Sequence, residues 1–243
     1  MITPMQLRAV FPTCRNPGVW CRAFGLSLPG TGIDETPRRL AMFLAQCGYE
    51  SESFNVLREL TSYRTVAQLR AVFPREFPTD DAAQKYIMNP SGLANFIYAN
   101  KLGNGPVESG DGFKYRGGGL LQITGRANYE AVGKAIGRDL ILRPNDVIIE
   151  AVAVQTSAYF WNLKGLNEAA DAGDFDHTTL RINGAAMEGA AERRELYQKL
   201  MVQLGAPTAL ETAVAARRAI PVPVDGLADP TLNSQRSLNQ FNT

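Results

Sequence analysis

The chain has 243 residues, 45% of them hydrophobic, which suits one moderately large folded domain, alone or with an appendage. Its 25 Lys and Arg residues almost balance its 24 Asp and Glu residues, giving a net charge of +1. A nucleic-acid-binding protein normally carries a clear basic excess, so this balance argues against that class. A local basic patch for a polyanionic partner remains compatible with it.

The three cysteines, Cys14, Cys21 and Cys47, argue against a disulfide-stapled secreted fold, because their number is odd and their spacing is irregular. Cys14 and Cys21 could pair, but free thiols in a reducing compartment are the simpler interpretation. The N-terminal sequence MITPMQLRAVF lacks the pattern of a signal peptide, and no apolar run approaches about 20 residues. We therefore expect no signal peptide and no membrane span.

In chain order the pattern is mainly helical. Thr3 and Pro4 start a short helix that ends near Phe11, and Thr36 with Pro37 starts a longer one. Asn-Pro-Gly at 16–18 indicates a turn, and we expect an irregular connection over 20–32. Further helices are predicted at 65–73, just after 79, and at 92–100, 127–136, 146–161, 166–172, 175–182 and 188–204, with a glycine-rich loop at 103–119 and a brief strand or extended segment at 120–124.

The composition changes after Gly205. Residues 206–243 contain several prolines, lose apolar periodicity and end in the polar sequence SQRSLNQFNT. We interpret this segment as a Pro- and Ala-containing tail or linker remnant, and residues 1–205 as one domain.

The helix that starts at Pro37 carries an unusual apolar face. Leu40, Leu44 and Cys47 share it at helical spacing, and the next position on the same stripe is Glu50. A carboxylate on a buried stripe needs a reason, because charged groups favour water. One reason is a proton retained near neutral pH, which apolar surroundings favour and which a general acid requires.

A second glutamate, Glu59, follows nine residues later, beyond a polar kink at 51–53. The chain can fold back there and set two carboxyl groups across a cleft, which is the arrangement that hydrolysis of glycosidic bonds uses. Glu52 is the competitor for the second role, although residues two apart on a helix face different ways. Spacing alone also fits the alternative that these glutamates are solvated surface charges.

Four motifs further specify the site. GYESESF at 48–54, Gly-Asn-Gly at 103–105, GDGFKYRGGGLLQITGRANY at 110–129 and Ile-Asn-Gly at 182–184 occur together and in this order. Over roughly residues 1–205 they resemble glycoside hydrolase family 19, most closely its bacteriophage endolysin branch. The resemblance implies a mainly α-helical, lysozyme-like hydrolase domain with a small extended element and no cofactor. It implies that Glu50 protonates the leaving glycosidic oxygen and that Glu59 activates a water. No Cys, His or Asp cluster has the spacing of metal ligands, so we also expect no metal.

The resemblance also implies that Gln122, Thr124 and Asn128 bind sugar hydroxyls, with Thr124 orienting the attacking water. In an extended segment Gln122 and Thr124 would project to the same face. The alternative is structural, with Thr124 and Asn128 capping the following helix.

Three more residues are implied to lie at the cleft. Asn183, followed by Gly184, matches a substrate-binding pair, although a helix C-cap explains the same residues. Arg193 matches an arginine near the cleft if one residue is inserted in the preceding loop, and Tyr115 would line the cleft or pack its floor. The sequence departs from the family pattern in the cleft but in neither carboxylate: Tyr49 replaces a histidine, Gly118 stands where an arginine is common, and Ala185 with Ala186 replaces a glycine and a small polar residue.

These features predict an endolysin that cleaves β-1,4 bonds between amino sugars of peptidoglycan by an inverting mechanism, for host-cell lysis. We expect a monomer that stays in the host bacterial cytoplasm until a holin-type system releases it to the cell wall. The alternatives are a chitinase that acts on chitin oligomers, an injected antibacterial effector, and a catalytically inactive glycan-binding module. The presence of both glutamates argues against the last.

Overall fold

The structure is a computed structural model that describes residues 1–205, and the predicted tail at 206–243 lies outside the described residues. The described chain is mainly helical, as predicted. In order its elements are α1 (Pro4–Val10), α2 (Pro17–Ser27), α3 (Pro37–Glu50), α4 (Val66–Val72), α5 (Asp80–Gln84), α6 (Pro90–Ile97), η1 (Val107–Ser109), α7 (Asp111–Lys114), α8 (Arg126–Ala135), η2 (Pro144–Ile148), α9 (Glu150–Leu163), α10 (Leu166–Asp171), α11 (Phe175–Asn183) and α12 (Ala190–Gln203), where η1 and η2 are 3-10 helices.

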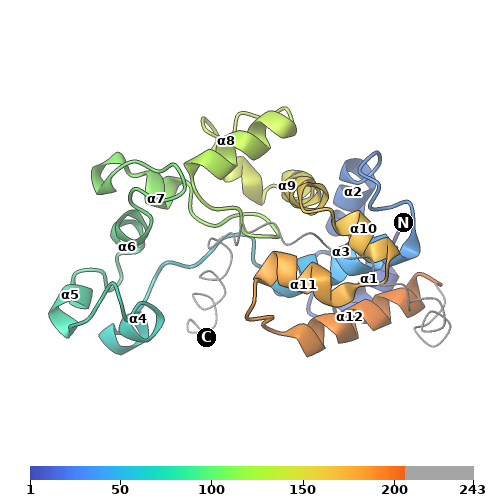
Figure 1. Ribbon diagram of the computed structural model, residues 1–243, viewed down its shortest axis with the longest axis horizontal. Coiled ribbons are helices and arrows are strands. Elements are labelled where there is room, and N and C mark those ends of the chain that lie inside the picture. Colours follow the sequence, from blue (N-terminus) through green and yellow to red (C-terminus); the bar gives the residue numbers. More distant parts are fainter. Residues whose placement is uncertain (206–243) are drawn as a thin grey trace.

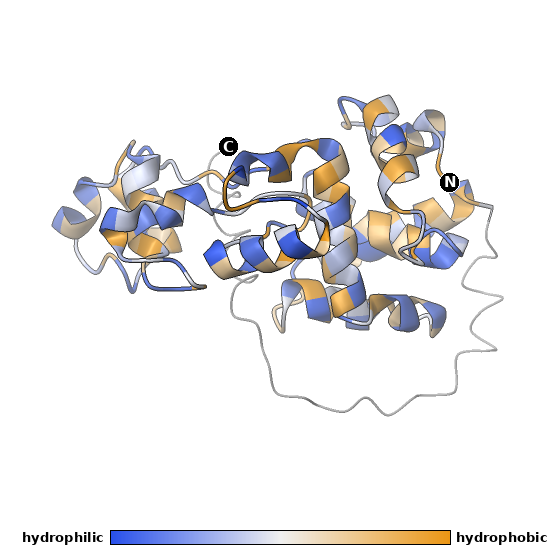
Figure 2. Ribbon diagram, turned by 90° about the horizontal axis from the view of Figure 1, so that it is seen from above, coloured by the Kyte–Doolittle hydropathy of each residue, from blue (hydrophilic) through white to orange (hydrophobic). Residues whose placement is uncertain are grey.

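The helices form a large bundle and a smaller lobe (Figure 1). The main lobe consists of α1–α3 and α9–α12, with α12 packed along α3 and α2 packed against α9. The small lobe consists of α4–α6 and has its own aromatic core, which includes Tyr63, Phe73 and Phe77. A third buried cluster, around Tyr115, Tyr129 and Val147, lies beneath α8. Hydrophobic and hydrophilic residues alternate along most helices, as amphipathic packing requires (Figure 2).

Helix starts follow the predicted caps. The Thr3 hydroxyl accepts from the backbone N–H of Gln6, and the Thr36 hydroxyl accepts from that of Arg39, each just before a proline at the first helical turn. Helix α3 continues through Gly48 to Glu50, where a Cβ on Gly48 would lie 2.4 Å from the Phe11 ring. Glycine is needed there because α1 and α3 approach closely.

Two predicted boundaries were wrong. The segment expected to be irregular at 20–32 begins as helix α2, because Asn16 and Pro17 start a helix rather than a turn. The helix expected from 146 begins at Glu150, after η2.

The predicted strand or extended segment at 120–124 is a turn. Gly118 forms isolated antiparallel bridges to Arg58 and Ile123, and Gln122 has a φ of 51°. Strand alternation therefore does not apply here, and the positions of Gln122 and Thr124 must be taken from their contacts.

Candidate active site

Glu50 ends α3 with its carboxyl directed at Arg193, on the first turn of α12. The two side chains form an ion pair in which the Glu50 side chain is 13% exposed and that of Arg193 is fully buried. The sequence suggested apolar surroundings for Glu50, whereas the structure places a buried cation beneath its carboxyl. The remaining exposure leaves one side of the carboxyl open to a ligand.

Two hydrogen bonds and a contact with an aromatic ring fix the Arg193 side chain in addition to the ion pair. Its Nη1 donates to Gln46 Oε1 at 2.6 Å, its Nε donates to the Glu188 carbonyl at 2.9 Å, and its guanidinium lies 4.2 Å from the centre of the Tyr49 ring. Gln46 lies one turn before Glu50, and its Nε2 donates to the hydroxyls of Thr178 and Thr179 on α11. The orientation of Glu50 is therefore fixed by α3, α11 and α12 together.

Glu59 lies in the connection between the lobes and is only 2% exposed. Its Oε2 accepts from the Tyr98 hydroxyl at 2.8 Å, and the Gly117 backbone donates to the carboxyl. Its Oε1 is buried and has no hydrogen-bond partner among the described residues. Glu52, the competitor for the second role, is exposed.

Burial raises the pKa of Glu59 above its ordinary value. The hydrogen bonds from Tyr98 and Gly117 and the nearby cations Arg116 and Arg58 oppose this effect without cancelling it. Glu59 is thus a carboxyl whose charged form is held chiefly by neutral donors.

Gln122 lies next to Glu59. A Cβ on Gly117 would lie 2.9 Å from Gln122 Oε1 and 3.1 Å from Glu59 Oε2, so both oxygens face the same small space. Gln122 Nε2 donates to the Gly119 carbonyl at 2.9 Å, which turns Oε1 toward that space, and Oε1 is also buried without a partner in the described chain.

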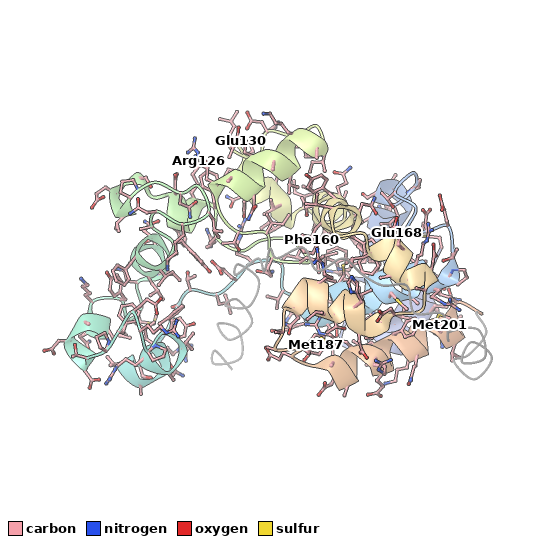
Figure 3. The ribbon with its side chains drawn as sticks, viewed as in Figure 1. Arg126, Glu130, Phe160, Glu168, Met187 and Met201 are labelled. Atoms are coloured by element: carbon pink, nitrogen blue, oxygen red, sulfur yellow. The ribbon has the colours of Figure 1, made fainter. Side chains whose placement is uncertain are left out.

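Gln122, Thr124 and Asn128 line one pocket of about 110 Å³. Its other wall is the end of α9, including Phe160, which is labelled in Figure 3. Thr124 Oγ1 donates to the Gln122 carbonyl at 3.0 Å, and Asn128 Nδ2 donates to the Thr124 carbonyl at 2.8 Å. Neither caps α8, whose N-cap is Gly125 without a side-chain bond, so the capping alternative was wrong.

Two predicted cleft residues are buried and make contacts within the protein. Tyr115 is fully buried and packs edge-on against Tyr129. Asn183 ends α11 before the C-cap Gly184, and its Oδ1 accepts from the Glu188 N–H at 2.5 Å. It thereby shapes the loop whose Glu188 carbonyl holds Arg193.

The departures from the family pattern also have local reasons. A Cβ on Gly118 would lie 2.5 Å from Val147 and 2.9 Å from Arg58 Nη1, so the space beside it is already filled. Arg58 Nη1 donates to the Tyr129 hydroxyl there at 3.0 Å. Tyr49 carries the aromatic face on which Arg193 lies.

Sequence reasoning missed Gln46 and Tyr98. Gln46 was detectable as a polar residue on the buried face of α3, four residues before Glu50. Tyr98 follows the apolar face of α6, and a buried tyrosine hydroxyl needs a partner, but nothing in the sequence names Glu59 as that partner.

No cluster of His, Cys, Asp and Glu suited to a metal is found among residues 1–205. In the same range no helix is long and apolar enough to cross a membrane. The three cysteines are free, with Cys47 fully buried as predicted.

A partly exposed carboxyl at a helix end and a buried carboxyl beside amide and hydroxyl groups, in a mainly helical fold, fit the class of glycoside hydrolases. Residues 78–199 match the family model for class I chitinases of glycoside hydrolase family 19. A Haemophilus influenzae protein with a glycosyl hydrolase family 19 domain is 45% identical over 203 residues, which cover 83% of this chain and 96% of that protein. The chain belongs to glycoside hydrolase family 19 and is a glycosidase.

More distant similarities agree. An Arabidopsis thaliana endochitinase is 31% identical over 147 residues, 57% of this chain and 46% of that protein. A bacterial family 19 chitinase structure has a TM-score of 0.57 at 22% identity, covering 85% of this chain and 96% of that one. Chitinase C from Streptomyces griseus has a TM-score of 0.57 at 20% identity, with coverage of 85% and 94%, so these structures show the fold alone. The family-model match begins after both glutamates, and their assignment rests on the 48–54 motif and on geometry.

Proposed function

We propose that the protein hydrolyses β-1,4 bonds between the amino sugars of peptidoglycan by an inverting acid/base mechanism. One observation carries the mechanism: Glu59 Oε1 and Gln122 Oε1 are buried acceptors without partners in the described chain, and both side chains lie beside Gly117. Buried acceptors of this kind are normally satisfied by protein or water. A water that donates one hydrogen to each would keep a lone pair free to attack.

In this mechanism Glu50 protonates the leaving glycosidic oxygen as the bond to the anomeric carbon breaks. The water attacks that carbon from the opposite face and passes its proton to Glu59. The partial exposure of Glu50 allows contact with the glycosidic oxygen, while the burial of Glu59 admits little more than a water. This difference in exposure favours single displacement, because a carboxylate that attacked the sugar carbon directly would have to be exposed to the sugar.

Thr124 and Asn128 bind sugar hydroxyls in the pocket they share with Gln122. A threonine hydroxyl can both donate and accept hydrogen bonds, and Thr124 Oγ1 donates to the Gln122 carbonyl. It therefore orients a water or a sugar hydroxyl by accepting a hydrogen bond.

Peptidoglycan is the proposed substrate, because the motifs at 48–54, 103–105, 110–129 and 182–184 together most closely resemble the endolysin branch. Chitin oligomers are the second candidate, favoured by the Arabidopsis relative and the structural neighbours, which are described as chitinases. The proposal extends to a phage lysis enzyme, a monomer, that stays in the host cytoplasm until a holin-type system releases it to the wall. An effector injected into a rival bacterium would use the same chemistry, and co-expression with and without a holin separates these settings.

The function is tested by digesting purified peptidoglycan and chitin oligomers with the unchanged protein and with the Glu50→Gln and Glu59→Gln variants. We expect muropeptide products by mass spectrometry, whose reducing ends identify the bond that is cut, and loss of products in both variants. Binding without products from the unchanged protein would instead indicate a glycan-binding module. Proton NMR of a fresh digest should show the α-anomer first; initial β-anomer would exclude inversion and the role given to Glu59.

A further inference from the structure

Tyr98 connects the small lobe to Glu59. It follows the last turn of α6, is 7% exposed, and donates its hydroxyl hydrogen to Glu59 Oε2 at 2.8 Å. Burial and the Glu59 charge raise the pKa of Tyr98 well above its ordinary value, so its hydroxyl remains a donor throughout the working pH range. Within residues 1–205, no other side chain donates a hydrogen bond to this carboxyl.

Asn104 ties the Tyr98 backbone to the catalytic segment. Its Nδ2 donates to the Tyr98 carbonyl at 3.1 Å, and its Oδ1 accepts from the Arg126 N–H at 2.9 Å. Arg126 begins α8, directly after the segment that carries Gln122 and Thr124. One buried amide therefore fixes the end of α6 relative to the start of α8.

The glycine before Asn104 allows this contact. Gly103 has a φ of 77°, and a Cβ there would lie 2.7 Å from the Ala127 Cβ. Leu102 also accepts from the Ala127 N–H at 3.0 Å through its carbonyl. The Gly-Asn-Gly sequence at 103–105 thus allows the backbone of this loop to pack closely against the start of α8.

Resting on the proposed role of Glu59 as general base, we propose that Tyr98 is a positioning residue for the Glu59 carboxyl and that Asn104 sets Tyr98 in register with Gln122. Tyr98 and the Gly117 backbone hold one edge of the carboxyl, and Oε1 is left to face the water. The register matters because the water must reach Glu59 and Gln122 at once, and these residues belong to different segments.

The chemical signature of this role is a pH profile. The Tyr98 hydrogen bond favours the charged form of Glu59, so its loss raises the pKa of Glu59 further. A general base must be ionised, and the acidic limb of kcat/KM should therefore move to higher pH. A hydrogen bond to a charged group corresponds to a shift of about one pH unit.

The test compares Tyr98→Phe with Tyr86→Phe, a change in another buried tyrosine of the small lobe, which stacks on Phe96 and has no recorded contact with Glu59. We expect Tyr98→Phe to move the acidic limb upward by about one unit, with a smaller change in the plateau, and Tyr86→Phe to leave the limb in place. An unmoved limb in a folded Tyr98→Phe protein would overturn the proposal. A shift of the alkaline limb instead would support the Tyr98 contact but show that Glu59 acts as the acid.

Asn104→Asp supplies the second variant, because it keeps the acceptor for Arg126 and removes the donor to Tyr98. We expect it to shift the acidic limb in the same direction, by less than Tyr98→Phe, and to add no further shift in that background. Additive shifts would show that Asn104 acts independently of Tyr98. Direct NMR titration of the Glu59 carboxyl in both variants measures the change in its pKa independently of enzyme activity. If neither variant changes the pKa of Glu59, the roles of Tyr98 and Asn104 are wrong, while the Glu59→Gln experiment still tests the proposed function separately.

Discussion

The two carboxyl groups of the site are held in opposite ways. Glu50 ends a long helix of the main lobe and pairs with a fully buried arginine, which α3, α11 and α12 keep in place. Glu59 lies on a connection between lobes and is held by a phenol and a backbone N–H. The first is supported by a cation and the second by neutral donors. Position in the fold, and not residue type, therefore gives the two carboxyl groups their different surroundings.

The largest expected effect comes from removing the proton donor. Glu50→Gln keeps the size of the side chain but cannot protonate the leaving oxygen, so activity on wall fragments should fall by about 10²- to 10⁴-fold. Glu52→Gln, in the exposed neighbour, should stay near the unchanged rate. Thermal melting should show both variants folded. Retention of more than about a tenth of the rate by Glu50→Gln would remove it from the acid role.

Glu59→Gln should cost far more activity than Glu52→Gln and also change how stability depends on pH. Because the folded-state pKa of Glu59 is raised, its favourable contribution is present below its unfolded-state pKa and is lost as pH rises through the folded-state value. Glutamine does not ionise, so the variant should gain stability relative to the unchanged protein at neutral pH. Denaturant titrations at acidic and neutral pH check this; equal differences at both would contradict the raised pKa.

Arg193→Leu tests the cation beneath Glu50. It leaves the Glu50 carboxylate and Gln46 without their partner, and breaking a buried ion pair in this way typically costs about 3–5 kcal/mol. The neighbouring Arg194→Leu breaks an exposed pair with Asp176 and should cost at most about 1 kcal/mol. Urea unfolding of both variants measures the difference. Similar values for the two would mean that the buried network adds nothing to stability.

Gly117→Ala tests the immediate surroundings of Glu59. Its methyl group would lie 2.9 Å from Gln122 Oε1 and 3.1 Å from Glu59 Oε2, and so push apart the two side chains that would hold the proposed water. Turnover should fall by about 10-fold or more, as expected for loss of an oriented reactant. Gly25→Ala, in α2 with no atom within 4 Å of the added methyl, is the matched control. Equal rates in the two variants would place the water elsewhere.

Thr124→Val is expected to slow turnover more than it weakens binding. Valine keeps the shape of the side chain but cannot accept a hydrogen bond from water or a sugar hydroxyl, and it releases the Gln122 carbonyl. The loss of one hydrogen bond to a reacting group predicts roughly a 10-fold lower kcat. Steady-state kinetics measures kcat and KM separately. An increase in KM alone would make Thr124 a substrate-binding residue only.

Local features of this site were predictable from the sequence, and contacts between distant segments were not. Thr36 caps α3 and Glu50 ends its apolar stripe because both depend on residues within one or two turns. Arg193 was found only by resemblance, and its purpose became clear from the fold, since 143 residues separate it from Glu50. The orientation of Gln122 was not predictable from strand alternation, because its segment is a turn and a hydrogen bond to the Gly119 carbonyl orients its amide. The tail at 206–243 stays a prediction.

The smallest expected effect concerns Tyr63, whose side chain is fully buried in the small lobe and whose hydroxyl has no partner among the described residues. Tyr63→Phe keeps the edge-on contact with Phe73 and removes an unpaired polar group. Stability should stay level or rise by about 1 kcal/mol, since an unsatisfied buried hydroxyl is costly. Activity should change by less than about 2-fold, because the Tyr98 hydroxyl, and not that of Tyr63, donates to Glu59. A loss of stability together with an upward shift of the acidic limb would place Tyr63 in the same support as Tyr98, because its hydroxyl would then reach the carboxyl through a bound water.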